Sequence, residues 1–321
     1  NTTGTRGTAI GHLSLAANTT GNFNVAVGDS VLDANTSGTS NTAVGQNSLT
    51  NNTTASNNVA VGNNALKLNT TASNNTAVGT QALQATTTGH SNTAIGRDAL
   101  KANTANYNVG VGNQALAANT SGEDNTGVGN SALATNTTGN DNTALGDNAL
   151  VFNTTGSNNT GLGSLAGYSN TTGHSNTSVG SEALRLNTTG ASNVAVGALA
   201  LDANTTGESI VAIGKDALGA NTTGVSNVAV GKGALASATV ANNNTAVGTH
   251  ALNASTTAVQ NVVVGAFAAD AITTGNDNAV LGTYALGVCT TGSNNIAIGT
   301  SSLGANTTGS SNTAVGAAAL D

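Results

Sequence analysis

The sequence contains no proline, methionine or tryptophan, a single cysteine, and few aromatic or charged residues. Aromatic residues make up 2% of the 321 residues and charged residues make up 7%. So few aromatic side chains cannot form the mixed core of an ordinary globular domain. Disordered chains are rich in proline, glutamate and lysine, which are absent or scarce here, so the composition does not indicate disorder either. The single cysteine, Cys289, excludes an internal disulfide framework.

The low charge and the short apolar segments exclude two classes of partner. The formal net charge is −7, and lysine and arginine are not clustered. Nucleic-acid binding requires such clusters, so we expect no DNA or RNA partner. No apolar run approaches the roughly 20 residues that cross a bilayer, so we expect no membrane insertion of this segment.

The most regular feature that is present is a glycine that returns every 17 residues. Its first eight occurrences are Gly11, Gly28, Gly45, Gly62, Gly79, Gly96, Gly112 and Gly129. The series continues to Gly316, and only the step from Gly96 to Gly112 is 16 residues long. With this glycine as position 5, the unit reads N-T-A-V-G-x-x-A-L-x-x-N-T-T-G-x-S, and we call each unit a coil. A short fixed period of this kind is typical of solenoids.

Apolar residues recur at four positions of the coil. Position 4 is Val, Ile or Leu in all 19 coils, and position 2 is usually Val or Thr. Position 9 is Leu in all but two coils, and position 11 is mostly apolar. Residues two apart share one face of a strand, and β-branched residues favour strands. We therefore expect an all-β fold, a parallel β-solenoid with two short strands per coil, near positions 1 to 4 and 8 to 11, whose apolar side chains form the core.

The remaining positions predict the turns and test the register. Glycine at position 5 indicates a turn that needs a positive φ or has no room for a Cβ atom. Asparagine at positions 1 and 12 can bond backbone groups, and identical asparagines in successive coils can bond one another as amide ladders. All charged residues fall at positions 6, 7, 10, 16 or 17, where they interrupt no apolar position.

Small residues occupy positions 3 and 8, which should face away from the apolar core. Position 3 is nearly always Ala, and position 8 is Ala or Ser in every coil except at Val31. A water-facing strand would carry polar residues there. We interpret these small residues as a subunit interface of a parallel homotrimer, against the alternative that tight coils have no room for larger side chains.

The repeat resembles those of known surface fibres. The stretch from Asn41 to Gly45, with Leu49 and the Asn52-Thr53-Thr54 corner, is similar to repeats of phage tail-fibre-type proteins. It is also similar to the S-V-A-I-G repeats in the heads of trimeric autotransporter adhesins, although those have a period near 14. The resemblance covers the whole chain. It implies a parallel trimeric β-roll that projects from a virion or a cell surface.

An enzyme would need a group of reactive residues that interrupts the repeat. His12, His90, His174 and His250 lie in different coils. His90 and His174 share position 16, but five coils separate them by roughly 24 Å, too far to share a metal ion. Cys289 replaces a corner asparagine, and we interpret it as a tolerated substitution. We therefore expect no catalytic residue, no cofactor and no metal site.

The glycine- and asparagine-rich turns invite comparison with two ligand-binding motifs. Calcium-binding β-rolls carry an aspartate in every turn, whereas Asp-Asn pairs occur here only sporadically, for example at Asp124, Asp141 and Asp277. That pattern argues against a calcium ladder but leaves one or two weak sites open. The glycines are not followed by Gly-Lys-Ser or Gly-Lys-Thr, so they do not form a phosphate loop.

The Asn-Thr-Thr corners match the glycosylation sequon, for example at Asn18, Asn69, Asn136 and Asn187. Glycans cannot fit on every coil at a spacing of about 4.8 Å, so we interpret the motif as corner chemistry, with occasional modification left open.

Aromatic residues interrupt the repeat at variable positions, and exposed rings can contact sugars. The candidate surface contacts are Phe23, Tyr107, Tyr168, Phe267 and Tyr284. The alternative is that these rings pack against neighbouring turns.

These observations predict a structural fibre or adhesin segment, extracellular on a phage or bacterial surface, without catalysis. Residues 1–321 form a single array of about 18 coils with partial units at both ends, which suggests the middle of a longer fibre protein. The partners are expected to be copies of the chain and a host-surface glycan or protein receptor. Two alternatives are an ice-binding solenoid, which Thr rows could support, and a self-stacking sheath filament. The adjacent Thr pair, as in Thr19-Thr20, places its side chains on divergent sides of a corner, which disfavours ice binding.

Overall fold

The computed structural model describes residues 2–321 and shows a parallel β-solenoid, as the repeat predicts. The chain forms two compact units, one ending at Asn158 and the other running from Asn159 to Asp321. The strands of the first unit are β1 (Thr8–Ile10), β2 (Val25–Val27), β3 (Thr42–Val44), β4 (Val59–Val61), β5 (Thr76–Val78), β6 (Thr93–Ile95), β7 (Val109–Val111), β8 (Thr126–Val128) and β9 (Thr143–Leu145). Those of the second are β10 (Thr160–Leu162), β11 (Thr177–Val179), β12 (Val194–Val196), β13 (Val211–Ile213), β14 (Val228–Val230), β15 (Thr245–Val247), β16 (Val262–Val264), β17 (Ala279–Leu281), β18 (Ile296–Ile298) and β19 (Thr313–Val315).

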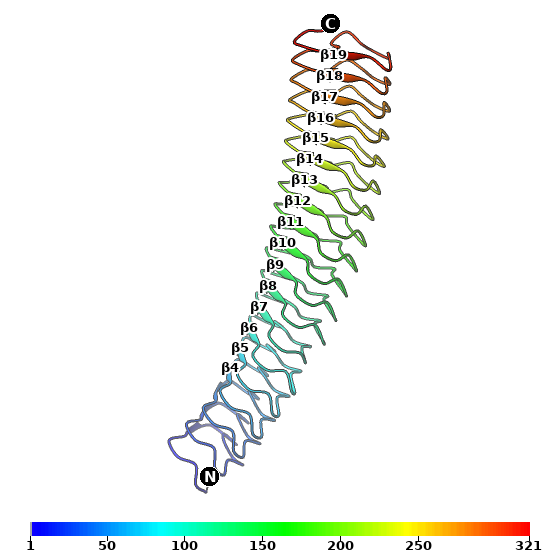
Figure 1. Cartoon of the computed structure of the whole chain (residues 1–321). Helices are drawn as coiled ribbons and strands as arrows, with labels where there is room; N and C mark the ends of the chain where they lie inside the picture. The colour runs from blue at the N-terminus through cyan, green and yellow to red at the C-terminus, as the bar shows by residue number, and fades with distance from the viewer. Residues whose placement is uncertain (1) are drawn as a thin grey trace. The chain divides into compact units, whose positions relative to one another are not determined.

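Within each unit, every strand pairs in parallel with the equivalent strand of the next coil (Figure 1). In the first unit Thr42 is opposite Val59, and in the second Val194 is opposite Val211, so the register advances by one 17-residue period. At the 16-residue step Thr93 is opposite Val109, so the strand register is preserved there too. The missing residue is therefore absorbed outside the strand.

The expectation of two strands per coil was wrong, because positions 8 to 11 form turns. Each coil has one three-residue strand at positions 2 to 4. After it, positions 5, 7 and 9 have positive φ, as in Gly62 (φ 133°), Asn64 (φ 58°) and Leu66 (φ 50°). Position 17 is also left-handed, for example in Asn57 (φ 61°). A segment in which every second residue has a positive φ cannot form an extended strand.

These turns are nevertheless tied to the neighbouring coils by backbone hydrogen bonds. The Asn64 N–H donates to the Gln46 carbonyl of the preceding coil at 3.0 Å. The Leu66 N–H donates to the Ala82 carbonyl of the following coil, also at 3.0 Å. The turn therefore satisfies its polar backbone groups between coils, as a strand does, although it is not extended.

The strand face that points into the coil is the opposite of the expected one. Position 3 is buried in every coil after the first, as in Ala26 and Ala43, which are 0% exposed. Positions 2 and 4 point outward and are half-buried or exposed throughout, as in Ile95, which is 42% exposed. Positions 8 and 9 complete the core, whereas position 11 is half-buried or exposed, as in Leu68.

The physical reason is the narrow interior of a 17-residue coil. A Cβ atom added to Gly110, at position 3, would lie 3.1 Å from Cγ of Leu100, at position 9 of the adjacent coil. One leucine from the turn thus fills the space against the strand, and only alanine, glycine or an occasional serine or valine fits opposite it. The small residues at positions 3 and 8 are internal packing residues, so the interpretation of them as a subunit interface was wrong.

Asparagines at positions 1 and 12 form the amide ladders that the sequence suggested. Asn35 Nδ2 donates to Asn18 Oδ1 at 2.8 Å, and Asn52 Nδ2 donates to Asn35 Oδ1 at the same distance. At position 1, the Asn41 N–H donates to Asn24 Oδ1 at 3.0 Å. Nearly all these side chains are fully buried. Buried amides that satisfy one another fix the stacking register, because a shifted coil would leave them unpaired.

The repeated glycine at position 5 has both features that favour glycine. Its φ lies between 113° and 145° in all 19 coils. A Cβ atom on Gly129 would lie 2.3 Å from the carbonyl oxygen of Gly146 in the next coil. The glycine column therefore lets the backbones of successive coils approach one another at this turn.

Candidate functional site

In a repetitive molecule, a specific site is best sought where the repeat is broken. The shortened coil provides such a break, because Thr104 at position 13 is followed directly by Ala105 at position 15. Elsewhere position 14 carries an exposed Thr, Ser or Val. The removal of one corner residue leaves a pocket of about 330 Å³.

The break also interrupts the hydrogen bonding of the threonine corner. In regular coils the position 13 threonine donates both its N–H and its hydroxyl to the position 13 carbonyl of the next coil, as Thr120 does to Thr137. Thr104 keeps these bonds to Thr120. Within the described residues 2–321, Thr87 donates neither its N–H nor its hydroxyl to the carbonyl of Thr104. The pocket therefore adjoins backbone and hydroxyl groups that a ligand could bond.

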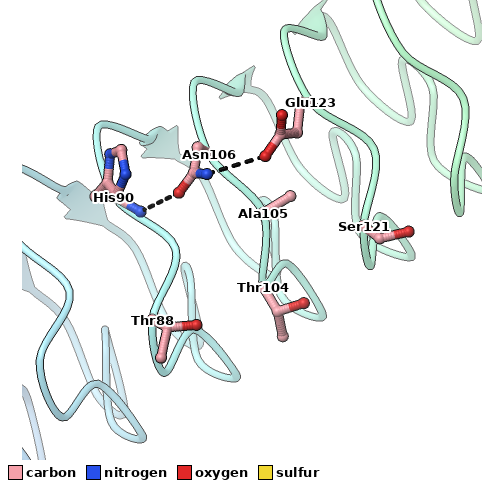
Figure 2. Close-up of a pocket in the computed structure, with 7 residues that line it drawn as sticks. All are labelled: Thr88, His90, Thr104, Ala105, Asn106, Ser121 and Glu123. Carbon is pink, nitrogen blue, oxygen red and sulfur yellow. Dashed lines mark hydrogen bonds between the residues drawn. The ribbon is translucent and has the colours of Figure 1, made fainter.

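Figure 2 shows two rows of polar side chains on either side of Ala105. One row is His90, Asn106 and Glu123. Asn106 Oδ1 accepts the backbone N–H of His90 at 2.9 Å, and Asn106 Nδ2 donates to Glu123 Oε1 at 2.9 Å. The second row consists of Thr88, Thr104 and Ser121, whose hydroxyls lie across the pocket.

This arrangement is suited to binding a polar ligand. The His90 ring packs edge-on against the Tyr107 ring, with centroids 5.3 Å apart. Glu123 accepts the Asn106 amide, so its carboxylate is held as a hydrogen-bond acceptor. Among residues 2–321, no group of three His, Cys, Asp or Glu side chains could hold a metal ion. In the same range, no helix is long and apolar enough to cross a bilayer.

The five candidate aromatic residues lie on three different columns of the coil. Phe23 and Tyr107 are at position 17, Tyr168 is at position 10, and Phe267 and Tyr284 are at position 7. Phe23 packs under the Arg6 guanidinium, 5.4 Å from the ring centroid. Phe267 and Tyr284 stack on one another, with centroids 5.4 Å apart and planes 10° apart. The structure brings only this last pair together.

Sequence reasoning missed a third member of the stack. The His250 ring lies 5.5 Å from the Phe267 ring, with 23° between their planes. His250, Phe267 and Tyr284 follow one another at the 17-residue period, so their common column was visible in the sequence. The result is a surface ladder of three rings in consecutive coils, and we call it the aromatic ladder.

Two other features of the sequence are buried. The sequon asparagines Asn69, Asn136 and Asn187 are 0% exposed, and their Nδ2 atoms donate inside the amide ladder. A glycan would have to be attached to that nitrogen, so the folded corner does not present a glycosylation site. Cys289 is also fully buried, and desolvation raises the pKa of its thiol.

No protein-family model matches this chain, and no curated protein sequence is significantly similar to it.

Proposed function

We propose that this chain is a structural segment of a surface fibre or adhesin, on a phage or a bacterial cell, and that it acts as a parallel homo-oligomer, most simply a trimer. Its role is to span distance and to present binding surfaces in host or surface attachment, without catalysis. The carrying observation is the outward strand face of each unit, which has Val, Ile or Leu at position 4 in every coil, mostly Val or Thr at position 2, and no charge.

This outward strip consists of the side chains at positions 2 and 4. Ile213 is 38% exposed, Val262 is 52% exposed and Leu281 is 51% exposed. No charged residue occurs at either position in any coil, because all charges lie on the turns. Position 4 alone gives an unbroken row of Val, Ile and Leu within each unit, and an exposed apolar row of this kind is characteristic of an interaction surface.

A second copy of the chain is the occupant that best matches the strip. Nine strands spaced by about 4.8 Å, each with two outward side chains, give the first unit a strip of roughly 400 Å². The second unit has ten strands and a strip of similar size. Each unit therefore offers about half of the roughly 800 Å² per partner of a standard stable interface. Parallel copies would bring identical rungs of each unit together, as a closed symmetric oligomer requires.

The mass of the native particle in sedimentation tests this proposal. We expect a stable species near three times the chain mass of 30.7 kDa at micromolar concentration. A folded monomer under the same conditions would contradict the fibre assembly.

The ice-binding alternative is supported by the exposed Thr column at position 14. It is weakened because the hydroxyl of the adjacent position 13 Thr donates to a carbonyl of the next coil, as from Thr188 to Thr205. Only one of the two columns therefore presents free hydroxyls to water. Thermal hysteresis in dilute solution would favour this alternative over the fibre.

A further inference from the structure

We propose that the second unit carries a saccharide-binding site at the free end of the aromatic ladder, and that it takes a neutral hexopyranose unit of a glycan. The inference rests on the attachment role proposed above and names the ligand class for it. The site is a hollow of about 340 Å³, at the small end of the range for ligand pockets.

The hollow exists because two glycines interrupt the column of side chains at position 10. This column reads Asp270, Gly287, Gly304 and Asp321 in four consecutive coils. Gly287 leaves a gap beside Asp270, whereas the Asp321 carboxylate lies over Gly304, where it would collide with an added Cβ atom. A Cβ atom added to Gly287 would lie 3.7 Å from Asp270 Oδ1, so the carboxylate reaches the rim of the gap.

Tyr284 supplies a platform on one side of this hollow. One face of its ring is covered by the stacked Phe267 ring. The equivalent residue in the next coil is Ser301, which has no ring to cover the other face. Tyr284 is 54% exposed and lines the hollow together with Ser301. The C–H face of a pyranose ring packs well on an aromatic face left open in this way.

Backbone groups around the hollow are also released from inter-coil bonding. In the second unit, the backbone N–H at position 11 donates to the backbone carbonyl at position 10 of the next coil. The first bond of this series joins Ser169 to Arg185, and the last joins Ala254 to Asp270. In the part of the chain that the structure describes, Ala271, Val288 and Ala305 make no such bond. The series of inter-coil bonds therefore ends where its acceptors would be Gly287 and Gly304. The carbonyl groups of Gly287 and Gly304 become available to ligand hydroxyls.

The charge of the lining selects the class of sugar. The residues around the hollow include two aspartates and no lysine or arginine. Carboxylates accept strong hydrogen bonds from sugar hydroxyls. They would repel the carboxylate of a sialic or uronic acid. A neutral hexose therefore matches the open face of the Tyr284 ring, the carboxylates that accept hydrogen bonds from its hydroxyls, and the negative charge of the lining.

The test uses the full chain on immobilised oligosaccharides built from glucose, galactose or mannose, with a sialylated set beside them. We expect binding to at least one neutral sugar and weaker binding to the sialylated set. Tyr284→Ala, which removes the platform, and Gly287→Val, which fills the hollow, should each weaken binding by about tenfold or more. Tyr284→Phe keeps the ring and should bind nearly as well as the unmodified chain.

Two matched variants control for general effects. Tyr168→Ala removes another tyrosine of the same unit, and Gly219→Val fills another position 10 glycine. Both should leave sugar binding unchanged. Absence of binding to every neutral sugar, or binding that Tyr284→Ala and Gly287→Val do not weaken, would overturn the inference.

Sedimentation of the same samples separates this inference from the proposed assembly. Trimeric particles that bind no neutral sugar would overturn the saccharide site alone. Monomers that bind sugar through Tyr284 would support the site and contradict the assembly.

Discussion

At the scale of single residues, the amide ladders show how much one side chain depends on its equivalent in the next coil. Asn69 Oδ1 and Asn221 Oδ1 are buried without a hydrogen-bond partner. The next residue in the column is Thr86 in the first case and Ala238 in the second. Thr86 uses its hydroxyl to bond the Asn103 carbonyl, and alanine has no donor. The position 12 ladder thus leaves a costly unpaired acceptor at both of these interruptions, whereas at position 1 the backbone N–H of Ile210 still donates to Asn193 Oδ1.

Restoring the ladder at Ala238 should stabilise the protein. In Ala238→Asn, the new Nδ2 can donate to Asn221 Oδ1, and the new Oδ1 can accept from the Ser255 hydroxyl, which is also buried without a partner. We expect the free energy of unfolding to rise by about 1–3 kcal/mol, measured by urea denaturation.

Ala238→Val is the control for this prediction, since it adds bulk without a donor and should not stabilise. Equal stability of the two variants would show that the unpaired amide oxygen is not the source of the effect.

Asp202 should make stability depend on pH. Its pKa is raised above the ordinary 3.8, mainly because burial disfavours the carboxylate, and this outweighs the opposing effect of Arg185. A raised folded-state pKa gives stability that is fully present below pH 3.8 and lost as the pH rises through the folded-state value. Asp202→Asn, which mimics the neutral acid, should therefore raise Tm at neutral pH. Melting curves from acidic to neutral pH should show this advantage shrinking on acidification, and an advantage independent of pH would contradict the assignment.

At the scale of the element, the coil balances backbone strain against burial and hydrogen bonding. A left-handed leucine such as Leu133 (φ 53°) costs about 1–2 kcal/mol. Full burial of its side chain contributes about 1.5–3 kcal/mol, and its N–H bonds the Ala149 carbonyl of the next coil. The left-handed backbone also turns the side chain inward, where it fills the coil. The strain therefore persists because neighbouring coils hold the turn in place.

This balance explains which parts of the fold could be predicted from the sequence. The period, the parallel register and the position 5 turn follow directly from the spacing of the glycines. The glycine spacing does not show which face of the strand points into the coil, because side chains alternate between two possible faces. The larger residues at positions 2 and 4 suggested the wrong one. The interior is filled by Leu100 and its equivalents, whose left-handed conformation no propensity would suggest.

The candidate sites were predictable only in part. Phe267 and Tyr284 could be selected as exposed aromatic residues, and their shared column was visible in the spacing. The hollow beside Tyr284 depends on the inter-coil backbone bonds that Ala271 and Val288 do not make, and only the structure reveals this. The pocket at the shortened coil depends likewise on where the missing residue is absorbed.

Lengthening the shortened coil should close its pocket. Insertion of a threonine between Thr104 and Ala105 restores the 17-residue period and the corner at position 14. Thr87 would then regain an acceptor for its N–H and its hydroxyl. We expect stability to rise by about 1–2 kcal/mol in urea denaturation.

The control is a threonine inserted between Thr138 and Gly139, in a regular coil, which should destabilise because the corner there is already complete. Loss of stability in both insertions would show that the shortened coil is optimal as it stands.

At the scale of the whole molecule, stability and assembly use different surfaces of the same repeat. Each coil buries its Ala and Leu against neighbouring coils only, so folding needs repetition and no distant contact. The outward strip takes no part in that core and carries no charge in any coil. Charged residues could be placed there without disturbing the coil, since they occur freely on the turns. Their exclusion from positions 2 and 4 is explained if this face is covered by another chain.

A lysine on the strip should therefore break the assembly while leaving the coil folded. Val128→Lys, at position 4 of β8, would bring a charge from each copy together in a dry interface, which costs several kcal/mol. The matched control is Asn130→Lys, at position 6, where Lys215 and Lys232 occur naturally. We expect sedimentation to give monomers for Val128→Lys and the same oligomer as the unmodified chain for Asn130→Lys, with the same circular dichroism spectrum for both. An undisturbed oligomer in Val128→Lys would mean that copies associate through a turn column, and the outward strip would then need another explanation.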